Sequence, residues 1–422
     1  MGKLKAFYVT FDGNREVYHA GNVVSGLVVV DLAEPLTCRG VRATFTGVAY
    51  VHWTESEGSG DHRRTVSYSA KQVYFEEVVT LWGKQAGDRQ GDNPTLPAGV
   101  HQMPFRLQLP NTGLPASFEG KSYGYVRYSI KSNIDRPWKF DHNTKRAFTV
   151  TGFPVDLNRV PNAMVPLREE DEKTVCCWCC ASGPIAMTAT ADRAAYTPGE
   201  RIIVSMDLNN NSSRKIHTTE AALVQHVLYT AYRRGHGRAH HRQATEKVVV
   251  LQGQGCGKYD KTDWRNQIIQ IPPVPLSGLE GVHFIDIQYL VEFEADVAST
   301  PFDLSVKLPI TIGSVPLQQL YGFAGNRPPI APPPGQGFAP PGSQFAPPGV
   351  PLTQSETIPM GNVGGTAPSA PPMPPPSYEL LYSGGQSIKD AEDNDYTYGE
   401  LDFAPRYTYY NWDAQEQTTR YS

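Results

Sequence analysis

The sequence has 422 residues, of which 40% are hydrophobic and 19% charged, enough for two or three domains. A formal net charge of −4 excludes a protein that binds nucleic acid by bulk positive charge. No apolar run reaches the roughly 20 residues of a membrane-spanning helix, and no secretory signal is visible. We therefore expect a cytosolic protein whose six cysteines are not paired as disulfides.

Residues 1–155 are predicted to form a β-sandwich of short strands. Val23–Val30 is β-branched and almost continuously apolar, as in a strand covered on both faces. Val41–Val48 alternates apolar and polar residues, and Tyr125–Ile130 is a further strand candidate. Turns rich in Gly, Pro and Asn separate these segments, and long helical periodicity is absent. The pattern predicts an all-β, immunoglobulin-like antiparallel sandwich.

Residues 156–183 are predicted to be a linker that carries a cysteine cluster. The linker contains the charged run Arg168–Lys173, followed by Cys176, Cys177, Cys179 and Cys180 around Trp178. Packing of these cysteines as small hydrophobic residues is our first interpretation, and acylation beside a membrane is the second. Zinc ranks third because adjacent cysteines point in different directions and do not easily enclose one tetrahedral ion. We expect no metal and no cofactor.

Residues 184–317 are predicted to form a second sandwich because they repeat the first half. Three pairs of segments match in the same order along the two halves, which favours duplication over chance similarity. The matched pairs are Tyr18–Val24 with Tyr196–Ile202, Val126–Ile130 with Ile287–Val291, and Phe148–Pro154 with Ile310–Pro316.

Residues 233–242 form a basic segment that we expect to be a loop between two strands. Its four arginines are Arg233, Arg234, Arg238 and Arg242. A solvated loop is the simpler interpretation. Contact with the phosphates of anionic lipids is the alternative, and it would give peripheral membrane association.

Residues 318–422 are predicted to be a disordered tail. From residue 317 onward the sequence holds 18 of its 36 prolines, and it has four basic but ten acidic residues. Such a change of composition marks a domain boundary.

Two peptide motifs stand close together in this tail. Pro375, Pro376 and Tyr378 form a PPxY motif. A polyproline II helix has three residues per turn, so Pro375 and Tyr378 share one edge, which suits the aromatic groove of a WW domain. Pro368, Ser369, Ala370 and Pro371 are similar to the signal read by the UEV domain of ESCRT-I. A stiff linker that binds nothing is the alternative for both motifs.

Enzyme signatures are absent from the sequence. It contains no glycine-rich dinucleotide or phosphate loop, no nucleophile-elbow motif and no His-Glu-x-x-His. We therefore predict a protein that is not an enzyme.

Five features together resemble the α-arrestins, the arrestin domain-containing proteins. They are the two-sandwich layout, Ser117–Gly120, Tyr196–Glu200, and Cys176–Pro184 followed by a PPxY tail. The resemblance implies two arrestin-fold sandwiches in an adaptor that links membrane cargo to HECT-type ubiquitin ligases. Several such proteins carry two PPxY motifs, whereas this chain has one.

We therefore expect a non-catalytic adaptor that promotes ubiquitination, endocytosis and endosomal or lysosomal sorting of membrane receptors or transporters. It would work in the cytoplasm, at the plasma membrane and at endosomes, with HECT-type ligases as partners. The alternative function is an ESCRT-linked sorting or budding scaffold that acts through Pro368–Pro371.

Overall fold

The computed structural model describes residues 3–60, 63–177, 180–235, 237–300, 303–321, 378–382, 386–389, 393–394 and 396–412. Strands dominate this part of the chain, as its β-branched and aromatic residues predict. Its helical segments are short: α1 (Gln318–Tyr321) and the 3-10 turns Asp12–Asn14 and Leu157–Arg159. Of the described residues, those up to 316 and those from 378 onward belong to one compact unit, and residues 317–321, which include α1, belong to another.

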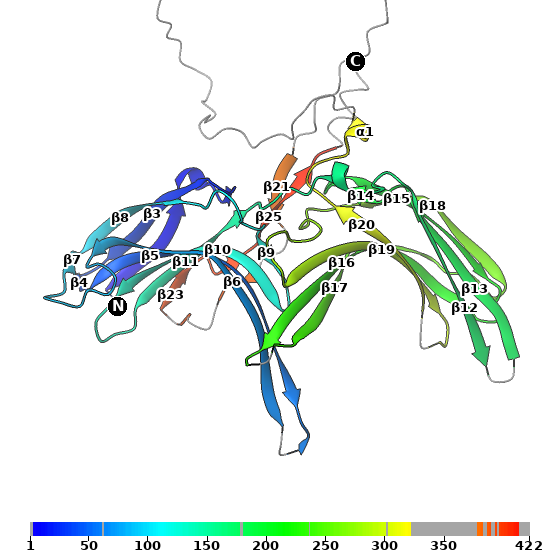
Figure 1. The fold of residues 1–422 in the computed structure, drawn as a ribbon, viewed down its shortest axis with the longest axis horizontal. Coiled ribbons are helices and arrows are strands. Elements are labelled where there is room, and N and C mark those ends of the chain that lie inside the picture. Colours follow the sequence, from blue (N-terminus) through cyan, green and yellow to red (C-terminus); the bar gives the residue numbers. More distant parts are fainter. Residues whose placement is uncertain are drawn as a thin grey trace, which may run out of the picture. The chain divides into compact units, whose positions relative to one another are not determined.

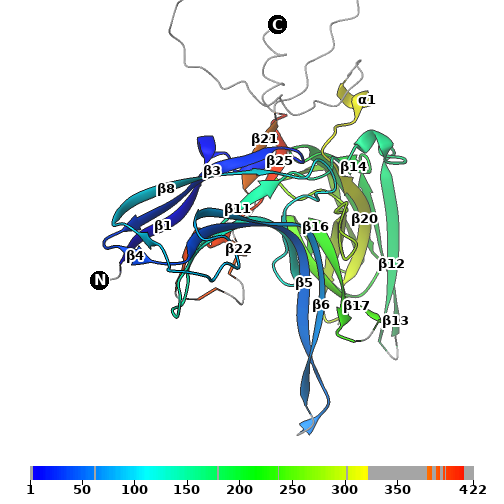
Figure 2. The ribbon, with the colours of Figure 1, turned by 60° about the vertical axis from the view of Figure 1, so that its left-hand side comes forward.

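The N-terminal sandwich has a three-stranded sheet that faces a longer one (Figure 1). The smaller sheet consists of β1 (Leu4–Phe11), β3 (Val23–Leu32) and β8 (Gly99–Gln108). The longer sheet contains β2 (Val17–Tyr18), β5 (Gly40–Glu57), β6 (Arg64–Gly83), β9 (Phe118–Glu119), β10 (Gly124–Asp135) and β11 (His142–Val150). The short strands β4 (Leu36–Thr37) and β7 (Thr95–Leu96) pair with each other. The outer part of the β5–β6 hairpin extends well beyond the neighbouring strands (Figure 2).

The C-terminal sandwich repeats this arrangement. Its four-stranded sheet consists of β12 (Leu167–Cys177), β13 (Cys180–Ala191), β15 (Arg201–Asn210) and β18 (Asp260–Gln270). The facing strands are β14 (Ala195–Tyr196), β16 (Ile216–Arg233), β17 (Ala239–Gln254), β19 (Ile285–Val297) and β20 (Leu304–Ile312). Tyr232 and Arg233 of β16 pair with β6, so the long sheets of the two sandwiches are hydrogen-bonded to each other.

Buried side chains hold the two layers of each sandwich together. Phe11 of β1 meets Phe105 of β8 and Phe148 of β11 edge-on, with ring centroids 6.5 and 6.0 Å apart. In the C-terminal half, buried Trp264 of β18 donates its indole N–H to Thr219 of β16 at 3.2 Å. Edge-on aromatic pairs and a satisfied buried hydroxyl both favour a fixed packing of the layers.

The predicted duplication is visible in the strand pairing. Tyr18 of β2 pairs in parallel with Val150 of β11, and Tyr196 of β14 pairs in parallel with Ile312 of β20. All four residues are buried. The segments that matched in sequence therefore occupy equivalent places in the two sandwiches.

The linker predicted over residues 156–183 is wrong for its second half. Residues 167–177 form β12, which pairs antiparallel with β13 at the edge of the four-stranded sheet. The charged run Arg168–Lys173 gave no strand signal because Glu, Asp and Lys are rare in strands. An edge strand exposes one side to water and tolerates such residues.

The disorder predicted over residues 318–422 does not hold for the described segments beyond residue 377. They form five short strands: β21 (Tyr378–Tyr382), β22 (Gln386–Ser387), β23 (Thr397–Gly399), β24 (Asp402–Phe403) and β25 (Arg406–Tyr410). β21 pairs with β25, β22 with β24, and β23 with β11 of the N-terminal sandwich. We refer to the described residues between 386 and 412 as the docked tail.

Candidate functional site

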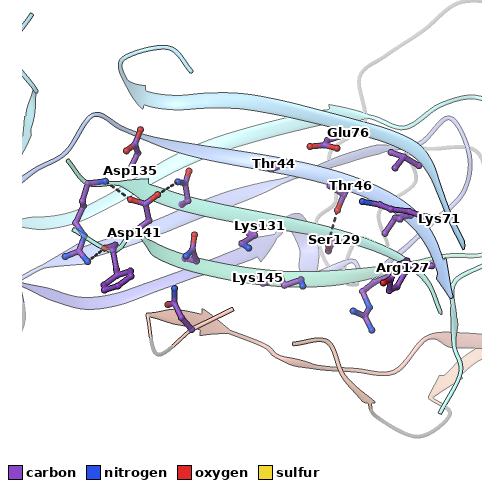
Figure 3. Close-up of a pocket in the computed structure, with 18 of the residues that line it drawn as sticks. Thr44, Thr46, Lys71, Glu76, Arg127, Ser129, Lys131, Asp135, Asp141 and Lys145 are labelled. Carbon is purple, nitrogen blue, oxygen red and sulfur yellow. Dashed lines mark hydrogen bonds between the residues drawn. The ribbon is translucent and has the colours of Figure 1, made fainter. Parts of the chain in front are cut away.

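The outer face of the long N-terminal sheet carries a polar groove. Along β10, the apolar core residues Val126, Tyr128 and Ile130 alternate with the polar residues Arg127 and Ser129, because successive side chains of a strand point to opposite faces. Figure 3 shows Arg127 and Ser129 together with side chains of β5, β6 and β11. The open groove has a volume of about 1180 Å³.

Basic side chains outnumber acidic ones in this groove. Its seven basic residues are Arg39, Lys71, Arg127, Lys131, Arg136, Lys139 and Lys145, and its three acidic residues are Glu76, Asp135 and Asp141. Asp135 is already paired, because it accepts hydrogen bonds from Arg39 at 3.0 Å and from Arg42 at 2.7 Å. The groove therefore has an excess of positive charge and suits an anionic segment.

A buried ion pair fixes one end of the groove. The guanidinium of Arg127 donates two hydrogen bonds of 2.7 Å to the carboxylate of Glu119, and both side chains are less than a tenth exposed. Burial raises the pKa of the Glu119 carboxyl, although the hydrogen bonds from Arg127 oppose this effect. The two-pronged geometry orients Arg127 along the sheet.

The docked tail covers the basic residues of β10 and β11. Lys145 donates from Nζ to the carbonyl oxygen of fully buried Ile388 at 2.9 Å, and Arg127 donates to the same oxygen at 3.5 Å. The carboxylate of Asp393 lies 3.8 Å from Nζ of both Lys131 and Lys145, and its side chain is only 4% exposed. The protein's own acidic segment thus supplies the negative charge that this face suits.

Strand pairing adds to these charge contacts. Thr397–Gly399 of β23 pairs in parallel with Asn143–Lys145 of β11. Next to it, the ring of Tyr396 stacks on Phe140 at 5.9 Å and meets His142 edge-on at 5.6 Å. Burial and the nearby Arg136 lower the pKa of His142 to about 4, so its imidazole is neutral at pH 7.

The end of the docked tail contacts both sandwiches. Arg406 pairs with Glu16 at 2.6 Å, and its backbone N–H donates to Thr149 Oγ1 at 3.2 Å. Tyr410 donates its backbone N–H to the carbonyl oxygen of Pro198 at 3.1 Å. Gly199 has φ +96°, and a Cβ there would lie 2.0 Å from the carbonyl oxygen of Tyr410. The glycine therefore permits the tail to lie against this turn.

Only part of the predicted WW-binding motif falls within the described residues. Tyr378 is the first residue of β21, opposite Tyr410 of β25. Pro375 and Pro376 lie outside the described residues, as do the predicted UEV-binding residues 368–371. Binding of either motif to a partner stays a prediction.

The predicted cysteine cluster lies at the tip of the β12–β13 hairpin. Cys176 and Cys177 end β12, Cys180 begins β13, and Cys177 pairs with Cys180. Cys179 lies outside the described residues. Among the residues that are described, no group of three or more His, Cys, Asp or Glu side chains could hold a metal ion. Packing, acylation and zinc binding, in that order, stay predictions for this cluster.

The predicted lipid-contacting arginines lie where the β16–β17 hairpin meets the β5–β6 hairpin. Part of the expected loop is strand, because β17 begins at Ala239 and includes Arg242. Arg242 pairs with Glu55 at 2.6 Å, and Arg233 pairs with Glu57 at 3.4 Å. These two arginines are partly neutralised within the chain, and contact of Arg233, Arg234, Arg238 and Arg242 with anionic lipids stays a prediction.

Sequence reasoning missed the residues that dock the tail. Ile388, Asp393, Arg406 and Tyr410 lie in a segment whose acidic, proline-rich context suggested disorder. One signal was available: Arg406–Tyr410 consists mainly of aromatic and β-branched residues, which is typical of a strand.

Comparison with known proteins gives matches to both halves of the body. Residues 7–158 match the N-terminal domain of arrestin (or S-antigen), and residues 181–317 match its C-terminal domain. The chain is 30% identical to arrestin domain-containing protein 17 of Caenorhabditis elegans over 97% of this chain and 100% of that protein. It is 29% identical to arrestin domain-containing protein 4 of Mus musculus over 75% of this chain and 73% of that protein. With arrestin domain-containing protein 1 of Homo sapiens it shares 28% identity over 80% of this chain and 69% of that protein.

Within the described ranges, every helix is too short or too polar to span a membrane. Two consecutive arrestin domains, and a similarity that extends over nearly the whole chain, show that the chain belongs to the arrestin domain-containing proteins, the α-arrestins.

Proposed function

We propose that this chain is a non-catalytic adaptor that recruits WW-domain HECT-type ubiquitin ligases to membrane cargo. Membership of the arrestin family supports the adaptor role. The observation that carries the ligase part is the PPxY motif of Pro375, Pro376 and Tyr378, which follows a two-sandwich body in the same chain. In a polyproline II helix the proline and tyrosine side chains share one edge, as a WW groove requires.

Tethering supplies the mechanism. The body binds the cytoplasmic parts of membrane receptors or transporters, and the motif binds a ligase. Because the adaptor binds the cargo and the ligase at the same time, it raises the concentration of the ligase near the lysines of the cargo without any new catalytic group. Ubiquitinated cargo then leaves the plasma membrane for endosomes and lysosomes, while the adaptor stays in the cytoplasm or bound to these membranes.

The motif is tested by calorimetric titration of a HECT-ligase WW domain with a peptide of residues 371–383. We expect micromolar binding that weakens at least about tenfold with Tyr378→Ala, because an aromatic anchor dominates a small interface. Tyr382→Ala in the same peptide is the matched control, since it removes a tyrosine outside the motif. Equal affinity of the Tyr378→Ala and Tyr382→Ala peptides would contradict the proposal.

A further inference from the structure

We propose that the chain masks its own ligase-binding tyrosine, and that a WW domain binds only after β21 separates from β25. This inference rests on the proposed function, because it concerns the regulation of the same motif. Its starting point is the register of the two strands, in which Tyr378, the last residue of the PPxY motif, lies opposite Tyr410.

The direction of the backbone groups of β25 shows how it holds β21. Arg406 and Tyr410 direct their N–H groups away from β21, to Thr149 and to Pro198. Neighbouring residues of a strand direct their N–H groups to opposite sides, so Tyr407 and Tyr409 direct theirs toward β21. Their partners in the register are Leu381 and Glu379, which flank the pair of Leu380 with Thr408.

β25 is anchored to the body independently of β21. Besides the two backbone bonds, Arg406 pairs with Glu16, and the hydroxyl of Tyr410 donates to the carbonyl oxygen of Ser314. Tyr410 is only 5% exposed. These contacts involve both sandwiches, so they hold β25 in place. β21 then pairs with the remaining edge of β25.

A WW domain and β25 exclude each other at Tyr378. Paired strands lie about 4.8 Å apart, whereas a WW groove must close around the proline and tyrosine side chains of its ligand. Tyr410 lies opposite Tyr378 in the register and is hydrogen-bonded to the body, so β25 occupies one side of the Tyr378 backbone. Binding therefore requires that β21 first leave the pair.

The mask is reversible because the paired sheet is small. β21 and β25 form a sheet of two strands, and β21 contributes only five residues to it. Isolated two-stranded pairs are marginally stable in water. Opening of β21 therefore leaves the sandwiches intact, and the fraction of open chains sets the apparent affinity for a WW domain.

The test compares binding of one WW domain to the peptide 371–383 and to the full chain, by fluorescence anisotropy of the labelled domain. If nine chains in ten are masked, the full chain binds about tenfold more weakly than the peptide.

Tyr409→Pro removes an N–H from the strand pair and lies 31 residues from Tyr378. We expect it to restore the affinity of the peptide. Asn411→Pro, just beyond β25, is the matched control and leaves binding weak.

A disulfide provides a second variant that does not depend on weakening the pair. Leu380 and Thr408 face each other between two hydrogen-bonded pairs, where Cα atoms lie about 4.5 Å apart, within the range of a disulfide. The oxidised Leu380→Cys/Thr408→Cys chain should lose WW binding and regain it on reduction. The peptide with Leu380→Cys alone should bind normally.

The outcomes separate masking from the proposed function. If the peptide and the full chain bind the WW domain equally well, and oxidation of the Leu380→Cys/Thr408→Cys chain does not change its binding, masking is wrong and the proposed function stands. A peptide that does not bind would overturn both.

Discussion

Two buried tyrosines make the same hydrogen bond in the two sandwiches. Tyr128 donates its hydroxyl to the carbonyl oxygen of Pro115 at 2.8 Å, and Tyr289 donates to that of Pro275 at 2.7 Å. Both lie in the segments that matched in the sequence repeat. A buried carbonyl without a partner is costly, so the hydroxyl explains why both positions hold tyrosine instead of phenylalanine.

One difference between these tyrosines gives a prediction. Tyr289 also accepts a hydrogen bond from Gln225 at 2.6 Å. Tyr289→Phe therefore removes two hydrogen bonds, and Tyr128→Phe, the matched variant, removes one. We expect the free energy of opening to fall by about 2 kcal/mol and about 1 kcal/mol, respectively. Native-state hydrogen exchange of β19 and β10 measures each sandwich separately. Equal losses, or none, would contradict this account of the two hydroxyls.

At the scale of elements, the strands with an apolar pattern could be predicted and the charged ones could not. Val23–Val30, Val41–Val48 and Tyr125–Ile130 lie within β3, β5 and β10, as expected. In these strands burial of one or both faces decides the structure, and burial leaves a pattern in the sequence. β12 lacks such a pattern because its pairing with β13 holds it at an edge.

The docked tail was missed for a related physical reason. Its strands are two to five residues long, too short for a periodic signal. Their position depends on partners far away in the chain, such as Lys145 for Ile388 and Glu16 for Arg406. A single sequence shows the acidic segment and the basic strands but not that they meet.

Docking of β23 on β11 should depend on Lys145. Lys145→Met removes the hydrogen bond to Ile388 and one of the two lysines beside Asp393, whose side chain is 4% exposed. Breaking a buried ion pair costs about 3–5 kcal/mol, and release of the tail avoids this cost. We therefore expect amide exchange in Thr397–Gly399 to accelerate at least about tenfold.

Lys139→Met is the control for this experiment, since Lys139 also lines the groove but its side chain is exposed. Hydrogen-exchange mass spectrometry compares the exchange rate of β23 in the two variants and in the wild type. If β23 exchanged at the wild-type rate in Lys145→Met, the charge contacts of the docked tail would not be what holds it.

At the scale of the whole molecule, one chain combines two arrestin domains with a segment that carries the PPxY motif. The two sandwiches form the body, and β10, β11 and the turn at Gly199 contact the docked tail. The sequence was enough to predict the fold and to find Tyr378 as the candidate ligase contact. It did not show that Tyr378 begins a strand that the body holds through β25.

Affinity capture from cell lysate, read by quantitative mass spectrometry, tests the ligase-recruiting role most directly. The baits are the full chain and its Tyr409→Pro form, each with and without Tyr378→Ala, and Pro371→Ala serves as the control outside the PPxY motif. We predict that Tyr378→Ala lowers the recovery of WW-domain HECT ligases at least about tenfold, while Pro371→Ala leaves it unchanged. Undiminished ligase recovery with Tyr378→Ala in both forms of the chain would contradict the account.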